Sequence, residues 1–387
     1  MKTINETKKE RQYFIDWLRI GLILSVYFYH IGMYFNSWGW HVKSKQPFTF
    51  LEPIMGWLHL WRMPLLFLVS GVGTYYALGH RSTKKYLKER FKRLFIPFFI
   101  GVFTLVPIQV YIEKIDDYNS LGNFYLHMFD GIYPTGNFSW HHLWFIIYLL
   151  IISLIISPFL NYMKSKHFNR VRGKLILFFS KKMNLNWILP ILIFSQYILR
   201  QYFPESTHAL IDDWAYFTYY LMFFLFGLIL FTSSEVINGL VVKRRLYGVQ
   251  TIIITIIYYA NIYLIAPSAL RYYIYFVTSL SIAWSCGMAV IGYAKMYANK
   301  DNKFRKSLNT AIYPFYLLHQ PVIVIIGYML LQLNLPTVVN VGLIIVLSLS
   351  ITISIYWIIY RSNILRVAFG MKTHQKSAKE TNKSIKV

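Results

Sequence analysis

Several ionisable side chains lie inside stretches of the sequence that are otherwise apolar. Asp16, Arg19 and His30 share one such stretch near the N-terminus. His30 follows Arg19 by eleven residues, so a helix would place both side chains on one face, about 16 Å apart along its axis. An ionisable group inside a membrane helix is costly and marks a candidate functional site. The pair suits a reaction that uses a cation at one membrane depth and a titratable imidazole at another.

Histidines also occur in or beside other apolar stretches. The further candidate site residues are His41, His59, Arg62, His142, Tyr316 and His319. His59 and Arg62 are three residues apart, so a helix would make them neighbours on one surface. Near His319, Pro314 and Pro321 would leave backbone carbonyls without their usual helical partners. We expect histidines from four helices to converge in the outer half of a bundle, with helix-packing hydrogen bonds as the alternative role.

The histidine pattern does not favour a metal ion. The spacings HxxxH and HExxH are absent from the sequence, and no buried carboxylate is expected beside the histidines. We therefore predict that no metal is bound. The single cysteine, Cys286, also excludes an intrachain disulfide and a cysteine-based metal cluster.

A basic segment, 81–93, lies between two apolar stretches. Arg90 and Arg93 would share one side of a helix there, and arginine forks match the geometry of phosphate groups. A phosphorylated ligand and anionic lipid would both suit this segment.

The composition indicates which elements must position these residues. Of the 387 residues, 56% are hydrophobic and only 14% are charged, whereas soluble domains have about 25% charged residues. The sequence therefore predicts an all-α, polytopic transmembrane helical bundle with no separate soluble domain. The net charge of +25 does not indicate a nucleic-acid partner, because the basic residues lie in short clusters between apolar stretches, as membrane insertion requires.

Ten apolar stretches are long enough to be membrane spans. They are 14–35, 54–79, 94–113, 142–163, 187–204, 214–232, 247–265, 271–295, 309–331 and 337–360. Of the 40 Lys and Arg residues, 33 lie in alternate connecting segments and at the two ends of the chain. The positive-inside rule then predicts that both termini are cytoplasmic. We expect a cytoplasmic N-terminus over 1–13, one membrane domain over 14–360, and a basic, disordered cytoplasmic tail over 361–387.

Several of these motifs, taken in order, resemble the acyltransferase-3 family of membrane acyltransferases over about residues 11–365. The motifs are Asp16-x-x-Arg19 with His30, Phe67-x-x-Ser70-Gly71, Arg90-x-x-Arg93 before Ile96-Pro97, His142-Leu-Trp144-Phe145, and Tyr316-Leu-x-His319. Within the family, the chain most resembles the glucans biosynthesis protein C group. The points of likeness are Trp40-His41-Val42, His59-x-x-Arg62-Met63 and His319-Gln-Pro321.

The resemblance implies an enzyme of the bacterial inner membrane that moves an acyl group from cytoplasmic acyl-CoA to a hydroxyl of an extracytoplasmic glycan. No bound cofactor is expected, since acyl-CoA is a substrate. The resemblance implies that His30 is the catalytic base and that Arg19 and Asp16 are further catalytic residues, with Arg19 on the donor side near the thioester or pantetheine. It also implies that Arg90, Arg93 and Ser70 bind the donor. The residues implied at or behind the acceptor are His41, His59, Arg62, His142, Tyr316 and His319. The acyl group (acetyl or succinyl), the acceptor and the oligomeric state stay open.

Two other classes of protein compete with this interpretation. A secondary transporter or flippase of a sugar-linked substrate would also have many spans and central polar residues, although no matched pair of broken helices is evident in two halves. A scaffold that only binds lipid would leave Arg19, His30 and His319 without a purpose, against the cost of inserting them. Hydrolysis of a thioester would separate the acyltransferase from both.

Overall fold

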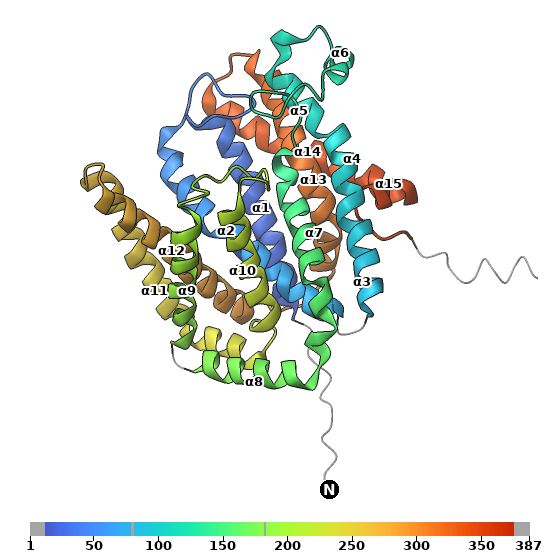
Figure 1. Cartoon of the computed structure of the whole chain (residues 1–387). Helices are drawn as coiled ribbons and strands as arrows, with labels where there is room; N and C mark the ends of the chain where they lie inside the picture. Colours follow the sequence, from blue (N-terminus) through green and yellow to red (C-terminus); the bar gives the residue numbers. More distant parts are fainter. Residues whose placement is uncertain (1–11, 79–80, 182, 375–387) are drawn as a thin grey trace, which may run out of the picture. The chain divides into compact units, whose positions relative to one another are not determined.

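The computed structural model describes residues 12–78, 81–181 and 183–374, which form helices joined by loops and contain no β-strand (Figure 1). The prediction of an all-α, polytopic helical fold is confirmed. The reason is physical: in lipid every backbone amide must find its partner within the protein, and a helix meets this need within one segment.

Eight helices form most of the molecule: α1 (Tyr13–Phe35), α2 (Glu52–Leu78), α7 (Trp144–Ile156), α10 (Trp214–Ile229), α11 (Ser234–Leu264), α12 (Ala269–Ala298), α13 (Lys303–Leu331) and α14 (Thr337–Arg361). The other α-helices of the described residues are α3 (Thr83–Arg90), α4 (Ile96–Thr104), α5 (Val106–Glu113), α6 (Leu121–Leu126), α8 (Lys166–Ser180), α9 (Ile188–Leu199) and α15 (Asn363–Ala368). A π-helical turn, Phe91–Phe95, joins α3 to α4.

The number of spans differs from the ten expected from sequence. Within the described residues, seven helical segments are long and apolar enough to cross a membrane. The number rises to nine if α8 with α9, and α10 with α11, each count as one bent span. Helices α9, with 12 residues, and α10, with 16, are shorter than the about 20 residues needed to cross the hydrocarbon core. Helix α11 has 31 residues and is counted only together with α10, as one bent pair. The count of ten and the side on which the termini lie are not confirmed.

The chain divides into two compact units, and the division passes through α1 and α13. The first unit comprises Met1–Val26, Pro53–Arg81 and Phe159–Asn309. Within it, α11 and α12 form a long antiparallel pair (Figure 1). Helices α2 and α10 cross with their backbones in contact, because a Cβ atom added at Gly71 would lie 2.0 Å from the Phe224 carbonyl oxygen. Such close crossings through small residues are typical of membrane helices.

The second unit comprises Tyr27–Glu52, Ser82–Pro158 and Thr310–Val387. Most of the apolar window of α13 is buried, whereas α14 exposes most of its apolar residues, as a lipid-facing helix would. Pro314 and Pro321 lie inside α13 and remove two of its backbone donors. As expected, these prolines leave backbone carbonyls of α13 without their helical partners, and one of those carbonyls is part of the site described below.

The expectation of a disordered tail starting at residue 361 is wrong for its first part. Residues Asn363–Ala368 form α15, and Met371 packs in an apolar cluster with Leu318 and Ile359. The basic side chain of Arg366 is buried there and donates to the carbonyls of Tyr360 and Lys372. The remainder of the expected tail, 375–387, lies outside the described residues.

Candidate active site

His30 and His319 form a hydrogen-bonded pair within the second unit. His30 Nδ1 lies 2.8 Å from His319 Nε2, and the two rings stack with their centroids 5.0 Å apart. The other nitrogen of His319, Nδ1, lies 2.6 Å from the backbone carbonyl oxygen of Tyr316. His319 is completely buried. Sequence spacing predicted both imidazoles as candidates, and the structure brings them into contact.

When both rings are neutral, the Tyr316 carbonyl determines which nitrogen atoms of His319 and His30 carry a proton. A carbonyl oxygen only accepts, so His319 Nδ1 must carry the proton and donate it to Tyr316. The bare Nε2 of His319 then accepts a hydrogen bond from His30 Nδ1–H. It follows that Nε2 of His30 is the unprotonated nitrogen, and that atom is the one able to take a proton from a substrate.

His142 meets the same helix through the carbonyl that a proline releases. Because Pro321 has no N–H, the carbonyl of Leu317 loses its helical partner. His142 Nε2 donates to that carbonyl over 3.1 Å, and the Tyr316 hydroxyl donates to the backbone carbonyl of His142. The predicted candidates His142, Tyr316 and His319 therefore form one connected group, with His142 edge-on to His319 at 5.5 Å between centroids.

A carboxylate lies close to the predicted candidate His41. Glu113 Oε2 is 2.5 Å from His41 Nδ1, and the Tyr133 hydroxyl donates to the other oxygen of Glu113 over 3.0 Å. On the far side of the ring, Gln320 Nε2 donates to His41 Nε2 over 3.2 Å. Sequence analysis expected no buried carboxylate beside the histidines; Glu113, which is half-buried, is a carboxylate there that it missed. Glu113 is the last residue of the predicted span 94–113 and of helix α5 (Val106–Glu113); a carboxylate at a helix end is the signal that could have found it.

Aromatic side chains line this group of histidines. Trp40 stacks on His30, with 6.3 Å between centroids and 15° between planes. His141 lies edge-on to His41 at 4.4 Å and to Tyr133 at 4.7 Å. Flat aromatic faces beside hydrogen-bonding groups suit a ligand that has both apolar and hydroxyl-bearing surfaces.

Arg19 and Asp16 lie in the first unit, at the N-terminal end of α1. Arg19 Nη1 donates to Asn309 Oδ1 over 3.3 Å and is 3.7 Å from Asp16 Oδ1. The other oxygen of Asp16 pairs with Arg305, whose side chain is 1% exposed and also pairs with Asp301. Sequence analysis missed Arg305 because it lies in a basic connecting segment. The structure thus gives Asp16 an ion-pair partner, while its predicted catalytic role is untested.

His59 and Arg62 also belong to the first unit. Arg62 is buried, with 4% of its surface exposed, and its charge acts on both His59 and His208. Burial and the Arg62 charge lower the pKa of His208, in the loop before α10, to about 4. His208 is a further group that sequence analysis missed, because its loop seemed to be a plain connection.

The expected donor residues have intramolecular contacts. Arg90 lies over the Tyr86 ring at 5.1 Å, and Arg93 Nε donates to the Gly370 carbonyl over 3.4 Å. Arg93 is part of the π-helical turn Phe91–Phe95. Such turns are frequent at functional sites. Ser70 donates to the carbonyl of Leu66 in its own helix. Their role toward a donor is still a prediction.

In the described residues, no group of three or more His, Cys, Asp or Glu side chains is arranged to hold a metal ion. The pair of His41 and Glu113 is completed by Gln320 and Tyr133, which are hydrogen-bonding groups. The donor set suits proton transfer and the binding of hydroxyl groups.

Comparison with known proteins connects this geometry to a family. The family model described as an acyltransferase domain, acyltransferase-3, matches residues 12–360. Glucans biosynthesis protein C of Escherichia coli (strain SMS-3-5 / SECEC) is 29% identical over 161 residues, which are 39% of this chain and 40% of that protein. The protein of the same name from Escherichia coli O1:K1 / APEC is 28% identical over 161 residues, with the same coverage.

The matched segment thus spans about two fifths of the length of these curated relatives. No solved structure matches the chain significantly. The family model, by contrast, covers nearly the whole chain, including every predicted site residue from Asp16 to His319. The protein therefore belongs to the acyltransferase-3 family.

Proposed function

We propose that this membrane acyltransferase transfers an acetyl or succinyl group from cytoplasmic acyl-CoA to a hydroxyl of an extracytoplasmic glycan in the bacterial inner membrane. The observation that carries the proposal is the hydrogen-bonded chain from His30 through His319 to the Tyr316 carbonyl. These hydrogen bonds leave Nε2 of His30 unprotonated, so that it can act as the neutral base that an acyl transfer to a hydroxyl requires.

The proposed reaction uses His30 as general base and then as general acid. Nε2 of His30 takes the proton of the acceptor hydroxyl while the hydroxyl oxygen attacks the thioester carbon. The carbon–sulfur bond of the tetrahedral intermediate then breaks, and the proton passes from His30 to the sulfur of the departing CoA. The products are the acyl ester of the glycan and CoA with a free thiol. His319 holds the His30 ring and stabilises its charged form through the Nδ1–H hydrogen bond.

The donor side of the proposal rests on basic residues. CoA carries several negative charges and does not cross lipid unaided. Arg90 and Arg93, in the basic segment 81–93, are proposed to bind its phosphates. Helix α1 is continuous from Tyr13 to Phe35, so Arg19 and His30 keep the eleven-residue helical spacing that places a cation three turns from the base.

The acceptor side of the proposal rests on the second unit. Trp40, His41, Glu113 and Gln320 offer an aromatic face and several hydrogen-bonding groups close to the His30–His319 pair. The relatives from Escherichia coli are named for glucan biosynthesis, and on that similarity we propose a glycan acceptor for this chain. The acceptor roles that the resemblance implies for His59 and Arg62 are retained as proposals.

The test is release of free thiol from acetyl-CoA and succinyl-CoA by the purified protein in detergent, together with direct binding of CoA. The wild type is compared with His30→Ala and with a matched control, His127→Ala, because His127 is an exposed histidine paired with Asp130. We expect CoA binding in all three proteins and loss of at least 100-fold in thiol release only for His30→Ala. Absence of CoA binding in a folded wild type would instead favour the transporter.

A further inference from the structure

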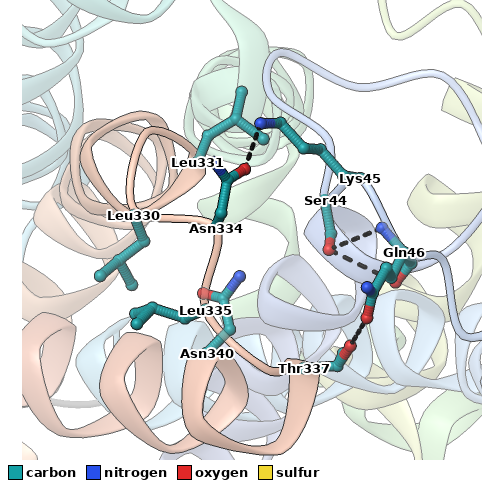
Figure 2. A pocket seen from close by; sticks show the side chains of 9 residues that line it. All are labelled: Ser44, Lys45, Gln46, Leu330, Leu331, Asn334, Leu335, Thr337 and Asn340. Atoms are coloured by element: carbon teal, nitrogen blue, oxygen red, sulfur yellow. Dashed lines mark hydrogen bonds between the residues drawn. The ribbon is translucent and has the colours of Figure 1, made fainter.

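A small polar pocket opens between the loop after α1 and the turn that joins α13 to α14, all within the second unit (Figure 2). Its volume is about 90 Å³, which is enough for several water molecules. The polar lining consists of Ser44, Lys45, Gln46, Asn334, Thr337 and Asn340, and three leucines complete the wall. The lining thus has mostly hydroxyl and amide groups and only one charged side chain.

The two segments that form the pocket are tied together by side-chain hydrogen bonds. Lys45 Nζ donates to Asn334 Oδ1 over 2.5 Å, and the Thr337 hydroxyl donates to Gln46 Oε1 (Figure 2). Asn334 has a φ of 47°, a left-handed conformation that asparagine adopts more readily than most residues. The side-chain amide oxygen of Asn334 thus accepts from Lys45, and the two hydrogen bonds hold the segments that form the pocket together.

One buried group in the wall has an unused hydrogen-bonding atom. Asn340 is 7% exposed; its side-chain amide interacts with the Tyr34 hydroxyl, and its Oδ1 atom accepts no hydrogen bond of good geometry from the described residues. A buried polar atom without a partner costs about 1–3 kcal/mol, so such atoms are uncommon and need a reason. A ligand hydroxyl that donates to this oxygen would supply the partner.

We propose that this pocket binds one sugar unit of the acceptor glycan, away from the reacting hydroxyl. The inference deepens the proposed function and rests on it. Amides and hydroxyls can replace the hydrogen bonds that a sugar edge makes with water, and the leucines can cover the apolar face of the ring. An anionic ligand fits less well, because Lys45 is the one cation in the lining and already donates to Asn334.

Helix α13 relates the pocket to the histidine pair. Leu330, in the pocket wall, follows His319 by eleven residues, which places both on one face of the helix and about 16 Å apart along its axis. A glycan whose reacting hydroxyl lies at His30 could reach the pocket only with a later sugar unit. The pocket should therefore favour long oligosaccharides over short ones.

The experiment measures binding of soluble gluco-oligosaccharides of increasing length, with α and with β linkages, to the purified full chain in detergent. The pocket variants are Asn340→Leu and Lys45→Met; the second replaces an exposed side chain and does not endanger folding. The matched control is Thr352→Val, which removes another buried oxygen without a described partner from the same helix, outside the pocket. Thiol release from acyl-CoA is measured in parallel.

We expect the wild type and Thr352→Val to bind longer oligosaccharides more tightly, and each pocket variant to bind them about three- to tenfold more weakly. Equal affinity in all four proteins would overturn the inference. So would a wild type that releases thiol from acyl-CoA but binds no oligosaccharide, which leaves the proposed function intact. A wild type with neither activity would overturn both.

Discussion

At the scale of single residues, the direction of one hydrogen bond decides which nitrogen of His30 can act. Replacing His319 with Phe keeps a ring of similar shape but removes the acceptor for His30 Nδ1–H. We expect thiol release to fall at least tenfold, and less than in His30→Ala, because the base is still present but its orientation is no longer fixed. Steady-state rates at saturating acyl-CoA, with CoA binding as the folding control, test this. An unchanged rate in His319→Phe would contradict the assigned tautomer.

The ion pair of Asp16 with Arg305 predicts a stability effect. The Arg305 side chain is 1% exposed, so removal of a partner leaves a buried charge with fewer compensating groups. We expect Asp16→Asn to lower the free energy of unfolding by about 2 kcal/mol, which is less than for an isolated buried pair because Asp301 remains. Thermal unfolding in detergent provides the measurement. Asp130→Asn is the control, since that carboxylate is 64% exposed; equal midpoints for the two variants would refute the expectation.

Much of the candidate site could be read from residue spacing. Helical periodicity and the prolines of α13 restrict where side chains and backbone carbonyls can lie. Four residues predicted in this way are in contact in the structure: His30, His142, Tyr316 and His319. The partners of His41 could not be found in this way. Glu113, at the end of α5, reaches His41 across a separation of 72 residues, and local periodicity carries no information about such a contact.

At the scale of helices, the crossing of α2 and α10 depends on glycine. A Cβ atom at Gly71 would lie 2.0 Å from the Phe224 carbonyl oxygen, and one at Gly227 would lie 2.0 Å from that of Leu68. Since backbone cannot move aside locally, Gly71→Ala should separate the helices and lower the thermal midpoint strongly. Gly21→Ala is the control, because nothing lies within 4 Å of that added atom. A Gly71→Ala protein as stable as Gly21→Ala would show that the crossing is not this close.

The loop before α10 should make stability depend on pH. The folded pKa of His208 is about 4 because of burial and the charge of Arg62, whereas an unfolded histidine has a pKa of about 6.5. The unfolded chain therefore binds more protons between these values, so stability is complete above about pH 6.5 and falls as the pH drops toward 4. Thermal midpoints of His208→Gln should fall less over this range than those of the wild type. His167→Gln, at an exposed position, should behave as the wild type; parallel curves for all three would contradict the role of His208.

The helices themselves were mostly predictable, and their interruptions were not. Each of the ten apolar stretches contains helix, because apolar length alone forces the backbone to bond within the segment. The π-helical turn Phe91–Phe95 and helix α15 have no such signal. Arg366 illustrates why: its charge suggested a solvated tail, but its guanidinium binds carbonyls at the end of α14 and beyond α15, and only tertiary packing shows this.

At the scale of the whole molecule, charge and helix length give different information about the number of spans. Of the 40 Lys and Arg residues, 33 lie in alternate connecting segments and at the two ends of the chain. This distribution predicts an even number of crossings, with both termini cytoplasmic. Helix length and composition allow seven to nine crossings in the described residues. With nine crossings the two ends of the chain would lie on opposite sides of the membrane. The side of the membrane on which the C-terminal residues lie therefore distinguishes an even number of crossings from an odd one.

Single cysteines can decide this, because the one native cysteine, Cys286, is buried. In a Cys286→Ser background, Thr135→Cys marks the expected outer loop, Asn169→Cys the expected inner segment and Thr373→Cys the end of the described chain; all three positions are exposed. A membrane-impermeant maleimide added to intact cells should label position 135 alone. Positions 169 and 373 should react only after permeabilisation, because the basic segments that flank both resist translocation. Labelling of 373 together with 135 in intact cells would mean an odd number of crossings and would remove the assignment of a cytoplasmic C-terminus.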